Sequence, residues 1–397
     1  MTNKHLPHDL KQMQSLPLES KIIMSTRRVR EWFEYWDGEV YVSFSGGKDS
    51  TVLADLVARF CQRYGYTLHL LFVNTGLEYP EIQKFVKDFA EWLRITYGIN
   101  VQLDIVRPDM RFDQVIKTYG YPVISKAVAD TIHFAKKNIA EGKDTLRVRQ
   151  LMGVEKNHEG SKSKFNKEKW RFLLDAPFDA HSECCYIMKK KPVYKYEQQT
   201  GRKPIIGTLA TESEQRKAVW EKHGCNAFGK KHPSSQPLSF WTEQDVLHYI
   251  KTYIQKRLDT EWKKVNSPYR TIRKNARKYV RSLNYMKLAY ASVYGDIQVK
   301  PPADAEEGQM NIIDFLGCYD KEDILETTGC DRTGCIFCMF GCHLEKEPNR
   351  FQRLKETHPR QYEYCIGGGE MVDGKWQPNK EGLGLGKVLD YIGVKYD

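Results

Sequence analysis

Six small or charged residues near the N-terminus have the character of an anion-binding turn: Ser45, Gly46, Gly47, Lys48, Asp49 and Ser50 (SGGKDS). They follow an apolar run at 40–44 and lead into a stretch of helical character at 50–61. The two glycines let backbone N–H groups turn toward an anion because no Cβ stands in the way. The helix start near Asp49 adds partial positive charge, the serines add hydroxyls, and Lys48 adds a full charge. The spacing is not that of a Walker A loop, but the segment still predicts a turn that wraps nucleotide phosphates.

A second set of residues that could do chemistry lies at 330–342, which read CDRTGCIFCMFGC. This segment holds four of the ten cysteines. Cys335 and Cys338 form a C-x2-C pair, whose spacing lets two thiolates hold one metal centre. Cys330 and Cys342 flank the pair and complete one local set of four. Four thiolates suit an iron–sulfur cluster, with tetrahedral zinc as the second choice. Three cysteines that stand alone in the sequence are expected to be buried free thiols: Cys61, Cys225 and Cys318.

The bulk properties limit the class of protein. A length of 397 residues suits two domains or one large α/β domain with appendages, and 41% hydrophobic residues are enough for a sizeable core. We find no run of eighteen apolar residues and no apolar signal core at the N-terminus, so we expect no membrane span and a cytoplasmic protein. The formal net charge of +11 suits an anionic partner such as a nucleotide or nucleic acid.

Apolar periodicity predicts strands that alternate with helices over much of the chain. The expected strands are 40–44, 68–73, 101–106 and 204–207, and the expected helices are 17–36, 50–61, 80–97, 112–119, 127–140 and 242–253. This order predicts a parallel sheet covered by helices. Thr242 and Asp245 form a capping box at the start of the last helix, and we expect Trp241 to pack in the core.

Two regions are rich in basic residues. Residues 141–170 are predicted to be a long loop whose second half is rich in lysine, and 256–287 to be a basic helical region with interleaved tyrosines. Arg273, Arg277 and Arg281 repeat every four residues and so share one helix face. Such a stripe suits a nucleic-acid backbone, with aromatics stacking on bases, although a solvated helix explains it equally well. The predicted division is 1–36 (helical segment), 37–253 (nucleotide-binding α/β domain), 254–317 (basic helical region) and 318–397 (cysteine-cluster region).

The phosphate turn resembles the PP-loop of the adenine-nucleotide α-hydrolase-like superfamily, which includes ATP pyrophosphatases and sulfonucleotide reductases. Further segments resemble the phosphoadenosine phosphosulfate (PAPS) reductase branch, in the family order: FVNTGLEYP at 72–80, Cys184-Cys185 followed by KKKP, GTLATESEQR at 207–216, and PLSFWTEQDVLHYI at 237–250. Together they cover about residues 37–253. The resemblance implies a Rossmann-like, five-stranded parallel sheet of the PP-loop type, with a helical and cysteine-rich C-terminal extension.

The resemblance also implies residue roles. ATP or a PAPS-like adenine nucleotide would bind the six turn residues together with Asn74, Thr75, Gly76, Gly207, Ser213 and Arg216, although Asn74 stands where the family often has an acidic residue. Lys48, Asp49 and Arg216 would be the catalytic residues, and Arg216 with Ser213 could clamp an anionic group. A Mg²⁺ ion would accompany the nucleotide. The cluster-bearing reductases imply a second set of cysteine ligands for a 4Fe-4S cluster: Cys184, Cys185, Cys335 and Cys338.

The sequence departs from the reductases in one respect. Their catalytic cysteine lies in a short motif at the extreme C-terminus, whereas this chain ends GVKYD and its nearest cysteine is Cys365. The chain is therefore more similar to the broader PAPS reductase family, including ATP pyrophosphatases of DNA phosphorothioation systems. We expect an ATP-dependent adenylating enzyme that supports sulfur transfer, with a nucleic acid and a sulfur-donor protein as partners. The alternatives are a sulfonucleotide reductase and a non-catalytic nucleotide- or nucleic-acid-binding module.

Overall fold

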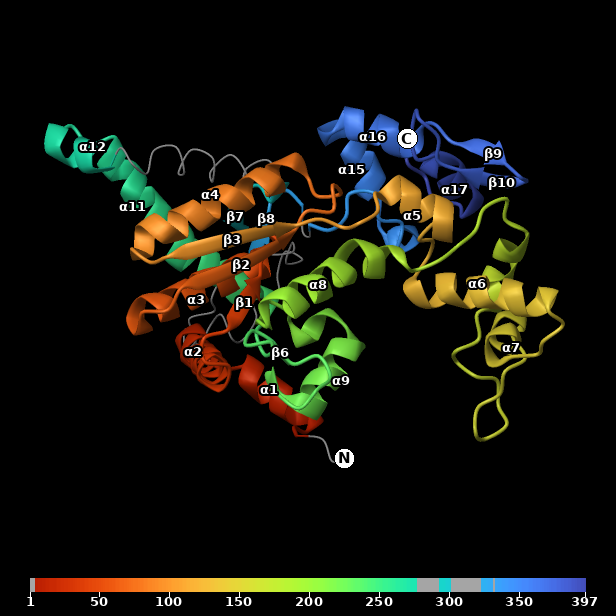
Figure 1. The fold of residues 1–397 in the computed structure, drawn as a ribbon, viewed down its shortest axis with the longest axis horizontal. Coiled ribbons are helices and arrows are strands. Elements are labelled where there is room, and N and C mark those ends of the chain that lie inside the picture. The colour runs from red at the N-terminus through yellow and green to blue at the C-terminus, as the bar shows by residue number, and fades with distance from the viewer. Residues whose placement is uncertain (1–3, 277–292, 301–322, 331–332) are drawn as a thin grey trace, which may run out of the picture. The chain divides into compact units, whose positions relative to one another are not determined.

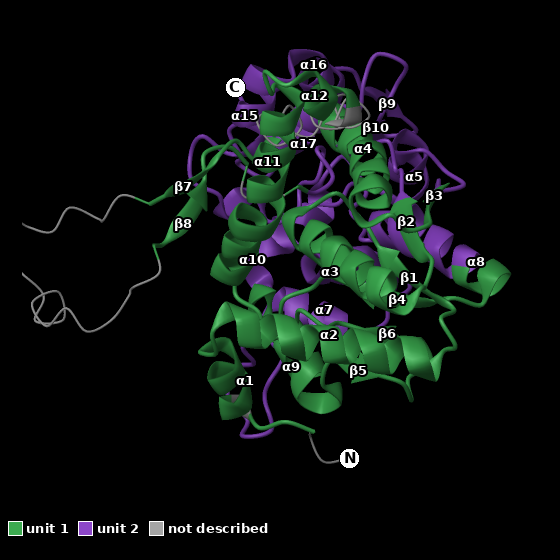
Figure 2. Ribbon diagram, turned by 90° about the vertical axis from the view of Figure 1, so that its left-hand side faces the viewer, with its two compact units in different colours: residues 1–72, 79–105, 197–333 green, residues 73–78, 106–196, 334–397 purple. Residues whose placement is uncertain are grey.

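The computed structural model describes residues 4–276, 293–300, 323–330 and 333–397 of the chain (Figure 1). It separates into two compact units, each built from segments that are distant in the sequence (Figure 2). Unit 1 contains residues 1–72, 79–105 and 197–333, and unit 2 contains residues 73–78, 106–196 and 334–397. The four-part division expected from the sequence stays a prediction.

A six-stranded sheet, rather than the expected five-stranded one, forms the centre of unit 1. Its strand order is β3-β2-β1-β4-β6-β5. The strands are β1 (Val40–Ser43), β2 (Leu68–Val73), β3 (Val101–Val106), β4 (Lys203–Ile206), β5 (Asn226–Ala227) and β6 (Ser234–Ser235). β1 pairs in parallel with β2 and β4, and β4 with β6, whereas β5 is antiparallel to β6. The additional strands are two residues long, too short to produce a periodic apolar signal in the sequence.

Helix α3 is the central helix of unit 1, and it packs against β1, α2, α4 and α10 (Figure 2). The helices of this unit include α1 (Pro7–Gln14), α2 (Leu18–Tyr35), α3 (Lys48–Tyr64), α4 (Pro80–Tyr97), α9 (Glu214–His223) and α10 (Glu243–Tyr249). Residues 51–58 of α3 are buried all around the helix, as expected for a helix enclosed by neighbours. Trp241 is fully buried and donates its indole N–H to the Ser25 hydroxyl at 2.9 Å, so its predicted packing role is confirmed.

Asp55, in the middle of α3, is a fully buried carboxylate. It accepts hydrogen bonds from the Tyr97 hydroxyl at 2.6 Å and the Tyr249 hydroxyl at 2.7 Å, and it pairs with Arg59 at 3.3 Å. Arg59 also lies over the rings of Tyr249 and Tyr253. Burial, together with the negative charge of Asp55, raises the pKa of both hydroxyls that donate to it. The network ties α3 to α4 and α10, because each helix supplies one partner.

The basic region begins as a helix that continues from α10 through a π-helical turn, η4 (Ile250–Gln255), into α11 (Lys256–Val265). Helix α12 (Arg270–Ala276) follows after a break that contains Pro268. Arg277 and Arg281 of the expected arginine stripe lie outside the described residues. Strands β7 (Ile297–Val299) and β8 (Leu325–Thr327) form a separate antiparallel pair in unit 1.

Unit 2 consists mainly of helices and turns. Its elements are α5 (Phe112–Tyr119), α6 (Lys126–Ala140), α7 (Leu146–Met152), η1 (Glu168–Asp175), η2 (Tyr186–Lys190), η6 (Cys342–Leu344), α15 (Arg350–Thr357), α16 (Pro359–Ile366), β9 (Glu370–Val372), β10 (Lys375–Gln377) and α17 (Leu385–Tyr391), and α8 (Lys191–Thr200) begins in it. The prediction of a long loop at 141–170 was wrong for part of its length, because α7 and the start of η1 lie within it, whereas 153–167 contain no helix or strand. The buried residues of α7 and η1 are too few for a clear helical period: Leu151 and Leu173.

The segments of unit 2 are joined by buried polar contacts. Gly120 has a left-handed φ of 112°, and a Cβ there would lie 2.4 Å from the Asp179 carbonyl oxygen. This close approach allows Tyr121 to pair with Ala180 in a parallel bridge. The Tyr121 hydroxyl donates to the Leu383 carbonyl at 2.9 Å, so residues from distant parts of the chain share one core. No helix in the described part of the chain is long and apolar enough to cross a membrane.

Replacement of Asp55 tests the buried network. Asp55→Ala leaves Arg59 and two tyrosine hydroxyls without their common acceptor, and we expect a loss of about 3–5 kcal/mol in the free energy of unfolding of unit 1. Tyr249→Phe removes one hydrogen bond to a charged group and should cost about 1.5–3 kcal/mol. Glu34→Ala, which removes an exposed ion pair with Arg30, is the control and should cost about 1 kcal/mol or less. Urea unfolding followed by circular dichroism measures all three, and equal losses for Asp55→Ala and Glu34→Ala would contradict the assignment.

Candidate functional site

The phosphate turn has a backbone that only glycine fits well. Gly46 has a left-handed φ of 76°, and a Cβ there would lie 2.9 Å from the Ile82 side chain and 3.0 Å from Val86. Gly47 has an extended backbone and caps the N-terminus of α3. A Cβ on Gly47 would lie 3.3 Å from the Thr333 hydroxyl and 3.5 Å from the Tyr294 hydroxyl. The turn is therefore enclosed by side chains on both sides, and its first helical N–H groups lie at the positive end of the α3 dipole.

The two serines of the turn hold its shape. Their hydroxyl oxygens lie 3.1 Å apart, and the Ser50 hydroxyl also donates to the Gly47 carbonyl at 2.9 Å. The Gly47 N–H donates to the Ser45 hydroxyl oxygen at 3.3 Å. Asp49, expected from the resemblance to be catalytic, lies in the first turn of α3 and makes further contacts of its own. The turn is thus ordered by its own hydrogen bonds, as a preorganised anion site requires.

Lys48 is the charged centre of the turn. Its side chain is only 8% exposed, and its ammonium donates to the Glu243 carboxylate at 2.9 Å. The ammonium also lies 5.7 Å from the centre of the Tyr294 ring, within cation–π range. The Tyr294 hydroxyl is in turn 2.7 Å from the Thr333 hydroxyl. A buried ammonium held by one exposed carboxylate can exchange that carboxylate for a phosphate.

Glu243, Tyr294 and Thr333 were not predicted as site residues. Glu243 lies within the segment PLSFWTEQDVLHYI, where only the capping role of its neighbours was considered. Asp245 indeed caps α10, since its carboxylate accepts from the Thr242 N–H at 2.6 Å, and it also pairs with buried Lys21 at 2.7 Å. The sequence did contain one signal for Glu243: it is an acidic residue in the first turn of a helix, next to this cap.

The structure brings Gly207 to the phosphate turn. Gly207 follows β4, and a Cβ there would lie 2.9 Å from the Asp49 carbonyl oxygen and 3.1 Å from the Ser50 nitrogen. Ser213 and Arg216 have other contacts. The Ser213 hydroxyl caps α9 by accepting from the Arg216 N–H at 3.3 Å, and the Arg216 guanidinium pairs with Glu212. The interpretation of Arg216 as a surface ion pair therefore describes the structure, and its role as an anion clamp stays a prediction.

Four cysteines gather within unit 2. Cys184 and Cys185 lie just before η2, and Cys335 and Cys338 lie in the turn that precedes η6. Hydrogen bonding to Cys185, and then burial, raises the pKa of the Cys184 thiol, with the charges of Cys338 and Cys335 acting in the same direction. The hydrogen bond from Cys184 lowers the pKa of Cys185. Cys184 is thus within electrostatic reach of the other three thiols, and Cys335 within reach of Cys338.

Two lysines accompany these thiols. Lys126 and Lys189 both act to lower the pKa of Cys185, against the effect of burial. Burial raises the pKa of Cys335 to about 11, although Lys189 opposes it. Burial acts to lower the pKa of Lys189, but the negative charges of Cys335, Glu78 and Cys185 raise it overall. Both lysines favour the thiolate of Cys185, the form in which cysteine binds a metal, whereas burial outweighs the effect of Lys189 on Cys335.

The four cysteine thiols are of the type that binds an iron–sulfur cluster. Their side chains lie in the same unit but do not surround a common centre. In the described ranges, no three histidine, cysteine, aspartate or glutamate side chains stand close enough to hold a metal ion. The alternative set includes Cys330, which belongs to unit 1, and Cys342, which is buried and donates its thiol to the Met339 carbonyl at 3.0 Å. Of the expected free thiols, Cys61 and Cys225 are buried, and Cys318 is outside the described residues.

The residues Asn74, Thr75 and Gly76 belong to unit 2, where they form a tight turn. The Thr75 hydroxyl donates to Glu78 at 2.7 Å, and the Gly76 N–H donates to the Asn74 side chain at 3.1 Å. The turn is joined to the cysteine segment, because the Ile336 N–H donates to the Leu77 carbonyl at 2.8 Å. The structure therefore joins the end of this turn at Leu77 to the cysteine segment at Ile336, within unit 2.

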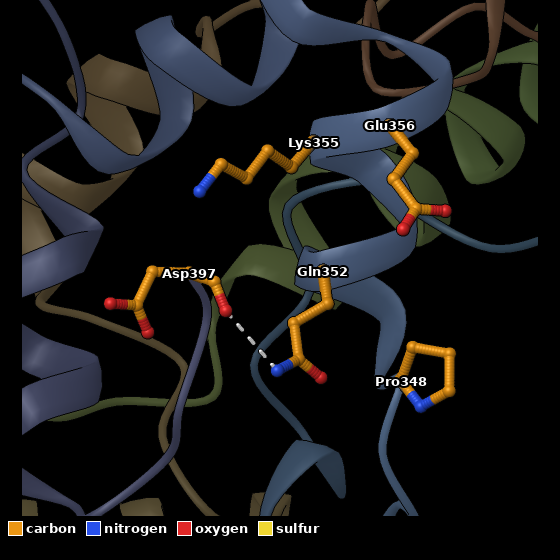
Figure 3. A pocket seen from close by; sticks show the side chains of 5 residues that line it. All are labelled: Pro348, Gln352, Lys355, Glu356 and Asp397. Carbon is orange, nitrogen blue, oxygen red and sulfur yellow. Dashed lines mark hydrogen bonds between the residues drawn. The ribbon is translucent and has the colours of Figure 1, made fainter.

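Two other features do not provide a reaction centre. Cys365 on α16 is completely buried, and burial raises the pKa of its thiol well above the usual value. A hollow of about 380 Å³ in unit 2 is lined by Pro348, Gln352, Lys355, Glu356 and Asp397 (Figure 3). The Gln352 side chain crosses it to the Asp397 carbonyl at 3.4 Å. This lining contains no nucleophilic thiol and only one cation, which is a poor match to a polyphosphate.

Comparison with protein families agrees with the geometry of the turn. The chain matches the model of the phosphoadenosine phosphosulfate reductase domain over residues 39–131 and 131–256. The chain belongs to this family. The matched residues include the phosphate turn, Cys184, Cys185, Gly207 and Glu243, and the family uses adenine nucleotides.

Comparisons with individual proteins give less information about this chain than the family match. No curated protein matches the chain. Among solved structures, an NMN synthetase from Francisella tularensis matches with 13% identity and a TM-score of 0.28, over 69% of this chain and 97% of that one. A U34-tRNA thiolase from Methanococcus maripaludis with its 4Fe-4S cluster matches with 16% identity and a TM-score of 0.29, over 69% of this chain and 77% of that one. TM-scores this low carry no argument about this chain.

The ion pair of the turn gives a prediction for nucleotide affinity. Because Glu243 competes with phosphate for Lys48, Glu243→Gln should tighten ATP binding about two- to fivefold, the worth of one partly exposed ion pair. Lys48→Ala should weaken binding about tenfold, since it removes a charged donor. Glu261→Gln breaks an ion pair with Lys264 on α11 and is the matched control, with no expected change. Isothermal titration calorimetry measures the three constants, and weaker binding by Glu243→Gln would show that Glu243 does not compete with the nucleotide.

Proposed function

We propose that this chain is an ATP-dependent adenylating enzyme that releases pyrophosphate and supports sulfur transfer. The observation that carries the proposal is the buried Lys48 ammonium, placed at the N-terminus of α3 by a turn that requires glycine and held by an exchangeable carboxylate. A polyphosphate needs such a cation and the N–H groups of a helix start. Membership in a family that uses adenine nucleotides supports the identity of that polyphosphate.

The proposed reaction is nucleophilic displacement at the α-phosphorus of ATP. An oxygen of the acceptor forms a bond to the α-phosphorus, the bond from that phosphorus to the bridging oxygen breaks, and pyrophosphate leaves with the electron pair. Lys48 and the backbone N–H groups of the turn stabilise the charge that develops on the phosphate oxygens. A Mg²⁺ ion bound with the nucleotide would neutralise further phosphate charge. Glu243 releases Lys48 when the nucleotide enters.

A 4Fe-4S cluster bound by Cys184, Cys185, Cys335 and Cys338 is the second part of the proposal. These four thiols share one unit, and Lys126 and Lys189 favour the thiolate of Cys185. When bound, such a cluster would carry sulfur or stabilise the fold. Four thiolates also suit zinc, which is the second choice of metal.

The sulfonucleotide reductase is the rival enzyme, and Cys365 supports it poorly. A reductase needs a mobile thiolate to attack sulfur, whereas Cys365 is buried within α16 and its pKa is raised.

The basic helices α11 and α12 favour a nucleic acid as acceptor, with exposed Lys263, Arg270 and Arg273. A nucleotide- or nucleic-acid-binding module without turnover is the remaining alternative, and a sulfur-donor protein is the partner that sulfur transfer requires.

A product assay tests the reaction. With ATP, Mg²⁺ and either tRNA or DNA, the anaerobically purified chain should release pyrophosphate. Lys48→Ala should slow the release about a hundredfold, because transition-state charge loses its main donor. Arg94→Ala, which removes an exposed cation near the end of α4 in the same unit, is the control. Thioredoxin-dependent sulfite release from PAPS without pyrophosphate would support the reductase instead, and tight nucleotide binding with neither product would leave the binding module.

Iron analysis tests the cysteine assignment. The anaerobic protein should contain about four iron and four acid-labile sulfide per chain. Cys184→Ser and Cys335→Ser should each lose most of both, whereas Cys225→Ser, at a buried thiol of unit 1, should keep them. Loss of iron in Cys330→Ser but not in Cys184→Ser would favour the local set. Zinc without iron would overturn the iron–sulfur assignment.

A further inference from the structure

The lysine-rich segment 161–172 of unit 2 (SKSKFNKEKWRF) has an unusual surface. It contains five basic residues and one acidic residue. Two of its aromatic side chains are exposed, Phe165 at 61% and Phe172 at 41%. Solitary exposed aromatics are common, but here they occur in one short segment with a strong positive charge.

Aromatic rings from three parts of unit 2 form a continuous row at the end of this segment. The ring centre of Trp170 lies 5.2 Å from that of His343 and 6.1 Å from that of Phe172. The Phe172 ring is 5.8 Å from Tyr391, at the end of α17. The Tyr391 hydroxyl donates to the Phe172 carbonyl at 3.1 Å, which fixes the two residues to each other. The row is therefore a built feature rather than a set of loose side chains.

Lysines lie over these rings. The Lys169 ammonium is 4.7 Å from the centre of the Trp170 ring, and the Lys164 ammonium is 5.4 Å from that of Phe165. Both lysines are exposed. Each of these two lysines thus accompanies an aromatic ring of the segment.

We propose that this surface binds single-stranded nucleic acid, and we call it the aromatic–lysine surface. It consists of Lys164, Phe165, Lys169, Trp170, Phe172 and Tyr391. Lysines match the phosphates, and exposed rings match unpaired bases, which stack on aromatic side chains irrespective of sequence. A duplex hides its base faces and would use only the charges. An acidic protein would likewise use the charges and leave the rings without a partner.

The inference rests on the proposed function and names the acceptor that it would serve. His343, at the end of the aromatic row, directly follows Cys342 in the segment that also carries Cys335 and Cys338. Unit 2 thus carries a nucleic-acid surface that adjoins its cysteine segment in the chain. The sequence-based assignment placed nucleic acid on residues 256–287 in unit 1 and took the lysine-rich segment at 162–169 only as additional support for such a partner.

Fluorescence anisotropy tests the surface with the full chain. The probes are a fluorescein-labelled single strand of about 20 nucleotides, as RNA and as DNA, and the duplex of the same sequence. The variants are Lys164→Gln with Lys169→Gln, and Phe165→Ala with Phe172→Ala. Matched controls on the rival basic helices are Lys263→Gln with Lys274→Gln, and Tyr269→Ala, whose side chain is 70% exposed.

We expect both variants of the aromatic–lysine surface to bind the single strand about tenfold more weakly, and the controls to change less than about twofold. The lysine variant should also reduce the slope of log K against log salt by about 1.4, because two phosphate contacts are lost. The aromatic variant should keep the slope and lose the preference for single strands over the duplex. A slope change in the aromatic variant would point to general unfolding instead.

Four outcomes overturn the proposal: no binding by the unaltered chain, loss of binding only in the control variants, equal binding of duplex and single strand, or full displacement by an acidic protein such as poly-glutamate at equal charge. ATP binding is measured on every preparation by calorimetry. If ATP binds and the single strand does not, this inference fails while the proposed function stands. If neither binds, the proposed function fails first.

Discussion

Backbone packs against backbone where β4 leaves the sheet of unit 1, and the phosphate turn depends on this contact. Gly207 lies so close to Asp49 and Ser50 that a Cβ would overlap the start of α3. On the other side of the turn, Gly46 has no space for a Cβ beside Ile82 and Val86. The start of α3 is therefore confined between a neighbouring strand and α4. A turn confined in this way keeps its N–H groups in place without a ligand, which lowers the reorganisation that nucleotide binding requires.

Because α3 is confined in this way, its charged residues Lys48 and Asp55 are buried and need partners of opposite charge. Near its N-terminus, buried Lys48 is neutralised by Glu243, which begins α10. Two turns later, Asp55 is neutralised by Arg59 and by hydroxyls from α4 and α10. Both contacts join α3 to α10, but they differ in their exchangeability. Asp55 is fully buried and has no access to a competing cation, whereas Glu243 is mostly exposed and can yield to phosphate. Helix α3 thus carries one buried charge, Asp55, whose contacts are permanent, and a second, Lys48, whose contact with Glu243 is replaceable.

The sequence predicted the parts of this arrangement that depend on local pattern. Strand–helix alternation predicted β1 to β4 and α2 to α6 within a few residues, and the two glycines with Lys48 predicted the turn between β1 and α3, whose phosphate binding stays a prediction. Glu243 and Tyr294 were not found, because their contacts with Lys48 join residues about 200 and 250 positions apart, and no local period records such a pairing. Helix α7, within the loop expected at 141–170, was not predicted, because it buries only one residue, which is too few to give a periodic apolar signal. The resemblance named Cys184 and Cys185, but it did not predict the lysines that accompany them.

The interleaved chain gives the cysteines of unit 2 a role beyond chemistry. Unit 2 consists of three separated segments, and the cysteine pairs belong to two of them, 106–196 and 334–397. Backbone hydrogen bonds, such as that from Ile336 to Leu77, join the third segment to the same place. A centre bound by all four thiolates would cross-link segments about 150 residues apart, and closure of so long a loop removes much entropy from the unfolded chain. The hydrophobic core of unit 2 around Tyr121 and Leu385 already holds these segments together, so a bound cluster would add stability to a framework that folds without it.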